Sequence, residues 1–308
     1  MKLAAFLFAL LVSCPAFGQG FPQKPVRIVV PFPPGGGADA LARLMAPKLS
    51  ELWKEQVLVE NKAGASGHIG AELVAQSAAD GTTLLMSSTA SLTAKNVSQF
   101  APLTLVSASP YVVTASNKVK AQNVNDLISY AKANPGKLTY GSSGTGAASH
   151  LSAELFKSMA KVDLLHVPYK GVGQAVADLL SGQVDLLFAP AQAVVPHVKA
   201  GRLRALATTG ARRAEALPDL PTVAESGLPG YEAVGWFGLL APAATPKPTV
   251  EKLGADFIRV LSDRETRARM QSLGADPVGN TPEEFARFIR DDQAKWAKLM
   301  REAGIKPE

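Results

Sequence analysis

Two short glycine-rich segments of the chain have the composition of an anion-binding site. They are residues 32–39 (FPPGGGAD) and residues 141–149 (GSSGTGAAS). Glycine lets backbone N–H groups approach a guest closely, and a helical pattern follows each segment, which would add roughly half a positive charge at the amino end. Either segment alone could be an ordinary tight turn. Together, with hydroxyl side chains beside the glycines, they favour a carboxylate site built from main chain.

Phosphate binding fits the second segment less well. Gly141 and Gly146 have the glycine spacing of a phosphate-binding loop, but Ala147 stands where that loop requires lysine. No G-x-G-x-x-G pattern occurs in the chain. Because these motifs depend on all of their residues, a carboxylate is the favoured guest.

A serine hydrolase is the strongest catalytic alternative. Ser142, Ser143 and His150 could join an aspartate in a triad, but the G-x-S-x-G elbow is absent because Thr145 occupies its fifth position. His166 falls in a strand that we expect to be buried, which favours a structural role. We therefore expect no catalysis, and we assign no residue to a metal.

The elements around both segments indicate an α/β fold. Short β-branched runs alternate with amphipathic helical stretches, a pattern typical of largely parallel sheets. Residues 26–30 form the strand before the first segment, and residues 137–140 form the strand before the second. Since ligands gather at the carboxyl ends of such strands, the two segments could hold one guest from opposite sides.

Length and composition predict two lobes. The chain has 308 residues, of which 47% are hydrophobic and 19% charged, enough for two cores of ordinary domain size. Residues 88–110, rich in Pro, Ser and Thr, are interpreted as the crossing between lobes. We place lobe 1 at residues 21–112 and 236–308, and lobe 2 at residues 113–235.

The amino terminus has the pattern of an export signal. Lys2 precedes an uncharged apolar run, and residues 16–18 (AFG) offer a cleavage site, so we expect a signal peptide at residues 1–18 and a periplasmic protein. Cys14, the only cysteine, lies in a sequence like a lipoprotein cleavage box, which leaves a lipid anchor open. The net charge of +6 is dispersed, so we expect no nucleic-acid partner.

Six segments, two of which contain the glycine-rich runs, make the resemblance to a known family specific, together with the closing helix. The chain resembles the substrate-binding proteins of tripartite tricarboxylate transporters, also called the Bug family, over essentially its whole mature length. The segments that carry the resemblance are KPVRIVVPFPPGGGADALAR, VENKAGASGHIGAELVA, YGSSGTGAASHLSAELFK, HVPYKG, DLLSGQVDLLFA and LPDLPTVAESGLPGYE.

The resemblance implies a periplasmic-binding-protein-like Venus flytrap, in which each of two lobes has a central β-sheet flanked by helices. Such a receptor captures a dicarboxylate, tricarboxylate, acidic amino acid or aromatic acid. It delivers this ligand, without catalysis or cofactor, to the membrane permease subunits of the transporter. Action through a sensor protein is the alternative. We expect a monomer.

The resemblance also implies which residues bind the ligand. Asp39 could anchor a water or an ammonium group, but a carboxylate at a helix start more often stabilises the first turn. Residues 92–99 are shorter than the family's usual segment, which leaves ligand size and cleft closure open. The expected ligand-binding residues are Phe32, Gly36, Gly37, Ala38, Asp39, Ser87, Ser88, Thr89, Ser143, Thr145, Gly146 and Ser149, with His150, Pro168, Tyr169 and Pro190 as weaker candidates.

Overall fold

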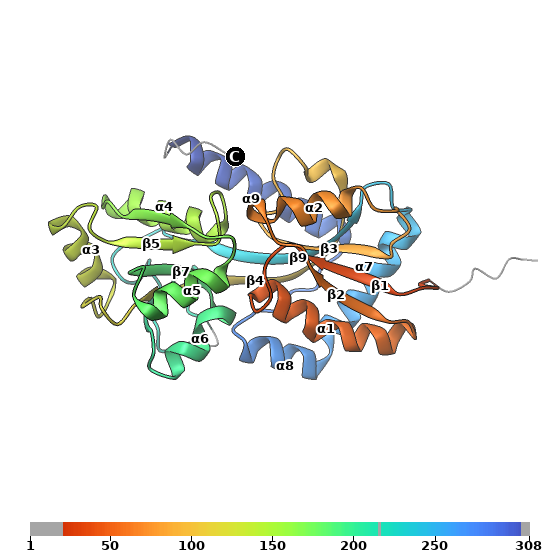
Figure 1. Ribbon diagram of the computed structural model, residues 1–308, viewed down its shortest axis with the longest axis horizontal. Coiled ribbons are helices and arrows are strands. Elements are labelled where there is room, and N and C mark those ends of the chain that lie inside the picture. The colour runs from red at the N-terminus through yellow and green to blue at the C-terminus, as the bar shows by residue number, and fades with distance from the viewer. Residues whose placement is uncertain (1–20, 215–216, 303–308) are drawn as a thin grey trace, which may run out of the picture.

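The computed structural model describes residues 21–214 and 217–302. Figure 1 shows two lobes side by side, joined by long strands and by the last helix. The expected export signal and Cys14 lie outside the described residues. Within the described ranges, no helix is long and apolar enough to cross a membrane.

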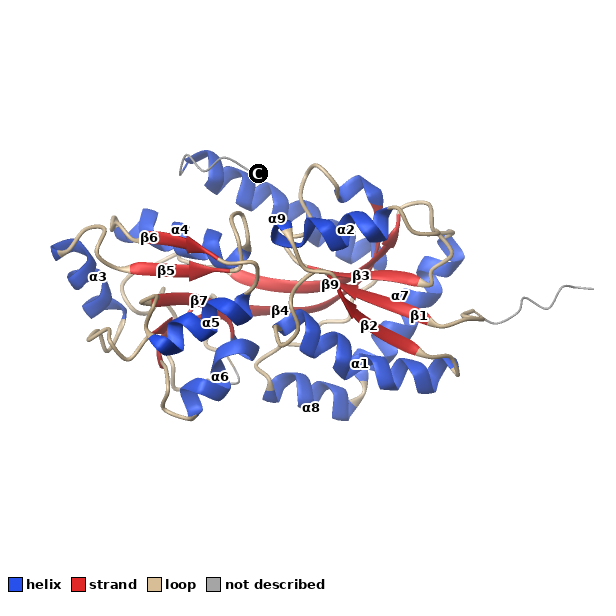
Figure 2. Ribbon diagram, viewed as in Figure 1, coloured by secondary structure: helices blue, strands red, loops and turns tan. Residues whose placement is uncertain are grey.

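Lobe 1 is built from the two ends of the chain. Its sheet is covered on one side by α1, α7 and α8 and on the other by α2 and the first half of α9 (Figure 2). The elements are β1 (Val26–Val30), α1 (Gly37–Trp53), β2 (Val57–Asn61), α2 (His68–Ala75), β3 (Thr83–Ser87), α7 (Lys247–Ser262), α8 (Arg264–Ser272) and α9 (Pro282–Glu302), with the short 3-10 turns η1 (Ala65–Gly67) and η2 (Val97–Gln99).

Lobe 2 is the middle of the chain. Its elements are α3 (Val124–Ala133), β5 (Thr139–Ser142), α4 (Ala148–Ala160), β6 (Leu165–Pro168), α5 (Val172–Ser181), β7 (Leu186–Pro190), α6 (Ala191–Lys199) and β8 (Arg204–Thr208). The prediction of alternating strands and helices is confirmed in both lobes, and the strand at residues 26–30 has the predicted bounds.

Two long strands, β4 (Phe100–Ala115) and β9 (Val234–Pro242), connect the lobes. The first part of β4 pairs with β9, whereas residues 111–115 pair with β7 and β8 of lobe 2. The strand order is therefore β2-β1-β3-β9-β4-β7-β5-β6, with β8 paired to β4. Residues 88–110 do lead from lobe 1 to lobe 2, but from Phe100 onward they do so as a strand.

The expectation of largely parallel sheets is correct only at the outer strands. β1 pairs in parallel with β2 and β3, and β5 pairs in parallel with β6 and β7. All pairings of β4 and β9 are antiparallel. The chain reverses direction in these two strands because it must leave lobe 1 along one of them and return along the other.

The last helix contributes to the cores of both lobes. Phe285 and Ile289 of α9 pack beneath β3 and β9 in lobe 1, while Trp296 and Leu299 pack with the core around Tyr140 in lobe 2. The second half of α9 thus packs outside the lobe in which the sequence-based boundary places it. Its start carries a capping box, in which Thr281 and Glu284 exchange hydrogen bonds.

Candidate ligand-binding site

The first glycine-rich segment presents free main-chain donors at the start of α1. Gly35 has φ of +86°, a conformation that favours glycine, and Gly36 caps the helix without a side-chain hydrogen bond. The first intrahelical bond runs from the Ala40 N–H to the Gly36 carbonyl, at 3.0 Å. The N–H groups of Gly37 and Ala38 precede this bond, so they have no intrahelical acceptor.

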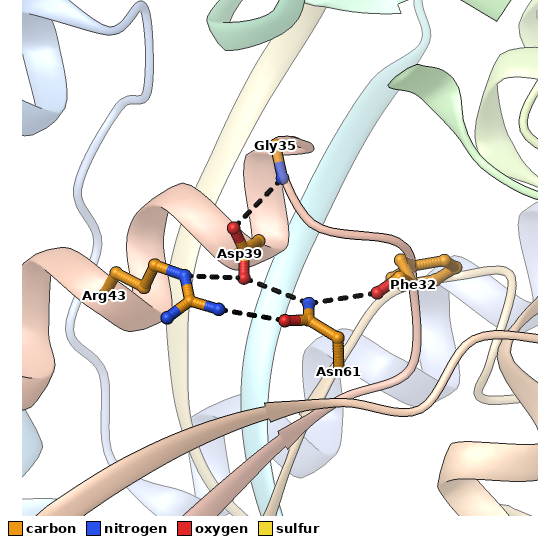
Figure 3. A network of polar contacts seen from close by, with 5 residues as sticks. All are labelled: Phe32, Gly35, Asp39, Arg43 and Asn61. Atoms are coloured by element: carbon orange, nitrogen blue, oxygen red, sulfur yellow. Dashed lines mark hydrogen bonds and ion pairs between the residues drawn. The ribbon is translucent and has the colours of Figure 1, made fainter. Parts of the chain in front are cut away.

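Asp39 fixes the shape of this segment (Figure 3). The residue is 5% exposed, and its carboxylate accepts hydrogen bonds from the Gly35 N–H at 3.0 Å, from Arg43 Nε at 2.9 Å and from Asn61 Nδ2 at 3.0 Å. Asn61 Nδ2 also donates to the Phe32 carbonyl at 3.1 Å. Burial raises the pKa of Asp39, but these donors outweigh it and hold the pKa below 3.8.

The second segment is held by its own side chains. Ser149 Oγ accepts from the Ser143 N–H at 3.0 Å, and His150 Nδ1 accepts from the Gly146 N–H at 3.1 Å. The first intrahelical bond of α4 joins the Leu151 N–H to the Ala147 carbonyl at 2.9 Å. Like α1, α4 begins without a side-chain cap, which leaves its first N–H groups available to a guest.

A histidine pair supports the second segment from behind. The rings of His150 and His166 stack with centroids 4.2 Å apart, and His166 also stacks on Tyr140 at 4.8 Å. His166 Nε2 lies 2.6 Å from Ser142 Oγ. Burial, followed by repulsion from His150, lowers the pKa of His166 to about 4. His166 lies on the edge strand β6 and is half-buried, so the expectation of a buried strand was wrong.

The serine that pairs with this histidine is not placed for attack on a substrate. Ser142 is fully buried, and its hydroxyl oxygen also accepts from the Gly144 N–H at 3.2 Å. Ser143 Oγ lies 3.0 Å from Ser149 Oγ. The contacts of both serines are those of residues that shape a loop.

Both segments line one cavity between the lobes. The cavity has a volume of about 40 Å³, which is more than the space that one water molecule needs. None of its lining residues is an aspartate, glutamate, lysine, arginine or histidine. These residues are Phe32, Pro33, Gly36, Gly37, Ala38, Ser88, Ala90, Tyr111, Ser143, Ala147, Ala148, Val172, Gly173, Pro190 and Phe237.

The lobes are closed over this cavity. A Cβ placed on Gly171 of lobe 2 would lie 2.7 Å from Pro33 Cδ of lobe 1, and one placed on Gly274 would lie 2.6 Å from Ala191 Cβ. Gly36 approaches Val172, whose Cγ1 would be 3.4 Å from a Cβ on that glycine. Glycine at these positions therefore allows the two lobes to come into direct contact.

The structure divides the expected ligand-binding residues into two groups. Those that line the cavity are Phe32, Gly36, Gly37, Ala38, Ser88, Ser143 and, among the weaker candidates, Pro190. Asp39, Ser149 and His150 lie behind it, where they fix the two segments. Those that also lie outside the lining are Ser87, Thr89, Thr145, Gly146, Pro168 and Tyr169.

Several residues outside the lining have other partners. Ser87 is fully buried, with its hydroxyl 3.0 Å from that of Ser91. Thr89 donates to Asp292 at 3.4 Å, and the Tyr169 hydroxyl donates to Asp178 at 2.7 Å. Residues 92–99, the shortened segment, are also absent from the lining; Leu92 packs in the core of lobe 1.

Sequence reasoning missed the residues that reach the cavity from other elements. Tyr111 lies on β4 and Phe237 on β9, so their side chains meet at the cavity only because the two strands cross between the lobes. Val172 and Gly173 begin α5. The sequence feature that could have pointed to them is the glycine at the end of the HVPYKG segment, which directly precedes them. In the described ranges, no group of three or more histidine, cysteine, aspartate or glutamate residues could hold a metal ion.

A two-lobed α/β fold closed over a small cavity, with helix starts facing inward from both lobes, defines a solute-binding protein. Residues 41–305 match the model of the tripartite tricarboxylate transporter family receptor, and the chain belongs to this family. The protein BugT of Bordetella pertussis is 34% identical over 315 residues, which cover 99% of this chain and 97% of BugT.

Two solved structures are similar to the whole fold. R. palustris Rpa4515 with adipate has a TM-score of 0.91 and 36% identity, and the match covers 94% of this chain and 100% of that one. MatC (Rpa3494) from Rhodopseudomonas palustris with bound malate has a TM-score of 0.84 and 31% identity, covering 91% and 99% of the two chains. These matches confirm the predicted fold class and family resemblance.

Proposed function

We propose that this protein is an extracytoplasmic solute-binding protein that captures a small carboxylate between its lobes and delivers it to the membrane permease of a tripartite tricarboxylate transporter. One observation carries the proposal. The uncapped starts of α1 and α4, which belong to different lobes, line the same cavity. The adipate and malate in the two similar structures support a carboxylate as the guest.

The electrostatics of the cavity favour a small anion, although no cationic side chain lines it. The positive ends of two helix dipoles face it, and each favours negative charge over a short range. The Tyr111 hydroxyl stays neutral, since burial raises its pKa above 10, and it can donate a hydrogen bond. Phe32 and Phe237 supply apolar walls for the carbon chain of the ligand.

Binding and closure are coupled because the site is complete only when the lobes meet. A ligand that contacts the start of α1 and the start of α4 together gains more free energy from the closed form than from an open one. It therefore shifts the population towards closure by that difference. The permease, or a sensor protein in its place, would then recognise the closed form.

We further propose that the protein works as a periplasmic monomer after signal cleavage, without catalysis or cofactor. The alternative is a protein that stays attached to the membrane by a lipid anchor at Cys14. The expected absence of catalysis rests on the family of receptors to which the chain belongs and on the loop-shaping contacts of Ser142 and Ser143. Hydrolysis assays on generic esters would reveal an enzyme directly.

A thermal-shift screen tests the proposed function. The mature protein is mixed with dicarboxylates, tricarboxylates, acidic amino acids and aromatic acids, with the matching esters and amides as controls. A ligand at a hundred times its dissociation constant adds about 2.7 kcal/mol to the protein's free energy of unfolding. The melting temperature of the protein should therefore rise by several degrees. Equal shifts with carboxylates and their neutral esters would contradict the proposal.

A further inference from the structure

Gln192 is a buried polar residue whose side-chain oxygen has no partner. It lies in the first turn of α6 in lobe 2 and is 9% exposed. Its Oε1 atom is buried and accepts no hydrogen bond from the residues that the structure describes. An unsatisfied buried acceptor costs about 1–3 kcal/mol, so a protein tolerates one most readily where a bound molecule satisfies it.

This oxygen lies behind the cavity wall, since Gln192 itself is not among the residues that line the cavity. Oε1 lies 3.6 Å from the point that a Cβ on Gly37 would occupy, and the Phe237 ring lies 3.0 Å from the same point. Gly37 and Phe237 both line the cavity. Gln192 therefore extends from lobe 2 to the first residue of α1, next to the main-chain N–H groups proposed to hold the carboxylate.

We infer that Gln192 is a specificity-determining residue that accepts a hydrogen bond from a hydroxyl group on the ligand carbon next to the carboxylate. This inference rests on the proposed function, and it narrows the ligand to 2-hydroxy carboxylates. An acceptor with no partner requires a donor, which a plain carboxylate lacks. In a 2-hydroxy acid the hydroxyl and the carboxylate are attached to the same carbon. The hydroxyl therefore lies close to the carboxylate that the N–H of Gly37 is proposed to hold.

An ammonium group is a poorer match for the same position. A buried ammonium needs a carboxylate partner to offset its desolvation, and no aspartate or glutamate lines the cavity. The nearby Asp39 already accepts hydrogen bonds from Gly35, Arg43 and Asn61. A neutral hydroxyl needs only the neutral amide oxygen that Gln192 provides.

Calorimetric titration with ligands that differ in one group tests the inference. The probes are succinate, malate and aspartate, which carry hydrogen, hydroxyl and ammonium at the same carbon, together with glutarate and 2-hydroxyglutarate. The wild-type protein should bind the hydroxy acid at least tenfold more tightly than the plain acid within one pair or both. Aspartate should bind more weakly than malate.

Variants of Gln192 separate its role from that of the carboxylate site. Gln192→Met keeps the length of the side chain but removes the acceptor, so the hydroxyl preference should fall below threefold while the affinity for the plain acid is retained. Gln192→Glu should shift the preference from malate towards aspartate. Gln183→Met, at an exposed glutamine after α5, should preserve the wild-type preference.

Two results would contradict the inference and are distinguishable from each other. If hydroxy and plain acids bind equally well and Gln192→Met leaves both affinities unchanged, Gln192 has no role in specificity, although the carboxylate site stands. If the folded wild-type protein binds none of the five acids, nor any acid in the thermal-shift screen, the proposed function fails and the inference fails with it.

Discussion

The indole nitrogen of Trp236 donates a 2.8 Å hydrogen bond to the carboxylate of Asp292. Trp236 lies on β9, one of the two strands that cross between the lobes, and Asp292 lies in the middle of α9, which packs on both lobes. Asp292 also accepts from Trp296 Nε1 at 2.9 Å and from Thr89 at 3.4 Å. This carboxylate therefore ties the connecting strand, the last helix and the loop after β3 together.

Replacing Asp292 with asparagine should lower the stability of the protein. Asparagine has one acceptor oxygen, so its NH₂ group must face the N–H of Trp236 or of Trp296 and leave that donor unsatisfied. We expect a loss of about 1–3 kcal/mol in the free energy of unfolding at neutral pH. Urea unfolding measures it, and Asp291→Asn, at the exposed neighbouring position, should change stability by less than about 0.5 kcal/mol. Equal effects of the two variants would show that the buried contacts of Asp292 add nothing.

Replacing Gly171 with valine should hinder closure of the lobes without unfolding lobe 2. The φ of Gly171 is 174°, which any residue can adopt, so the added side chain acts only through its contact with Pro33. We expect a loss of tenfold or more in ligand affinity, because the closed form carries the complete site. Small-angle X-ray scattering should show that excess ligand compacts the wild-type protein but not the variant. Compaction of both proteins would mean that this contact does not limit closure.

The Asp39 carboxylate should make stability fall in acid. Its folded-state pKa lies below 3.8, so the charged form is stabilised by folding. This contribution is present above pH 3.8 and is lost as the pH falls through the folded-state value. Asp39→Asn should lower the free energy of unfolding at pH 7 by about 1–2 kcal/mol and make it less dependent on pH below 3.8. Chemical unfolding from pH 7 to pH 2.5 measures this, and parallel curves for the two proteins would refute the assignment.

His166 should act on stability in a higher pH range. Its folded-state pKa of about 4 lies below the ordinary value of 6.5, so between these values the unfolded chain binds the proton that the folded protein excludes. Stability should therefore fall as the pH is lowered from 6.5 to 4. His166→Gln should remove this dependence, whereas His68→Gln at the start of α2 should retain it. A wild-type dependence that persists in His166→Gln would assign it to another group.

The sequence predicted those elements whose signals are local. The apolar run at residues 26–30 is the strand β1, and Thr281 and Glu284, spaced as the capping-box pattern requires, form that box. Gly37 and Ser143, which belong to the two glycine-rich segments before helices, line the same cavity. In each case the pattern of a few neighbouring residues determines the local conformation.

The sequence did not predict features that arise from distant contacts. The prolines and serines of residues 100–110 are typical of a loop, yet this segment pairs with β9 along its length, with register shifts after Pro102 and Leu105. Tyr111 and Phe237 meet at the cavity although 126 positions in the numbering separate them. From its residue type, Asp39 could either contact the ligand or stabilise the first turn of the helix. Only its contacts with Arg43 and Asn61 show that it fixes the shape of the glycine-rich segment.

A crystal structure of the mature protein with the tightest carboxylate from the thermal-shift screen is the most direct test of the central claim. We predict that one carboxylate group of the ligand lies within hydrogen-bond distance of N–H groups at the start of α1 and at the start of α4. A ligand held elsewhere, such as the wider groove beside His68 and Glu72 of about 490 Å³, would contradict the account.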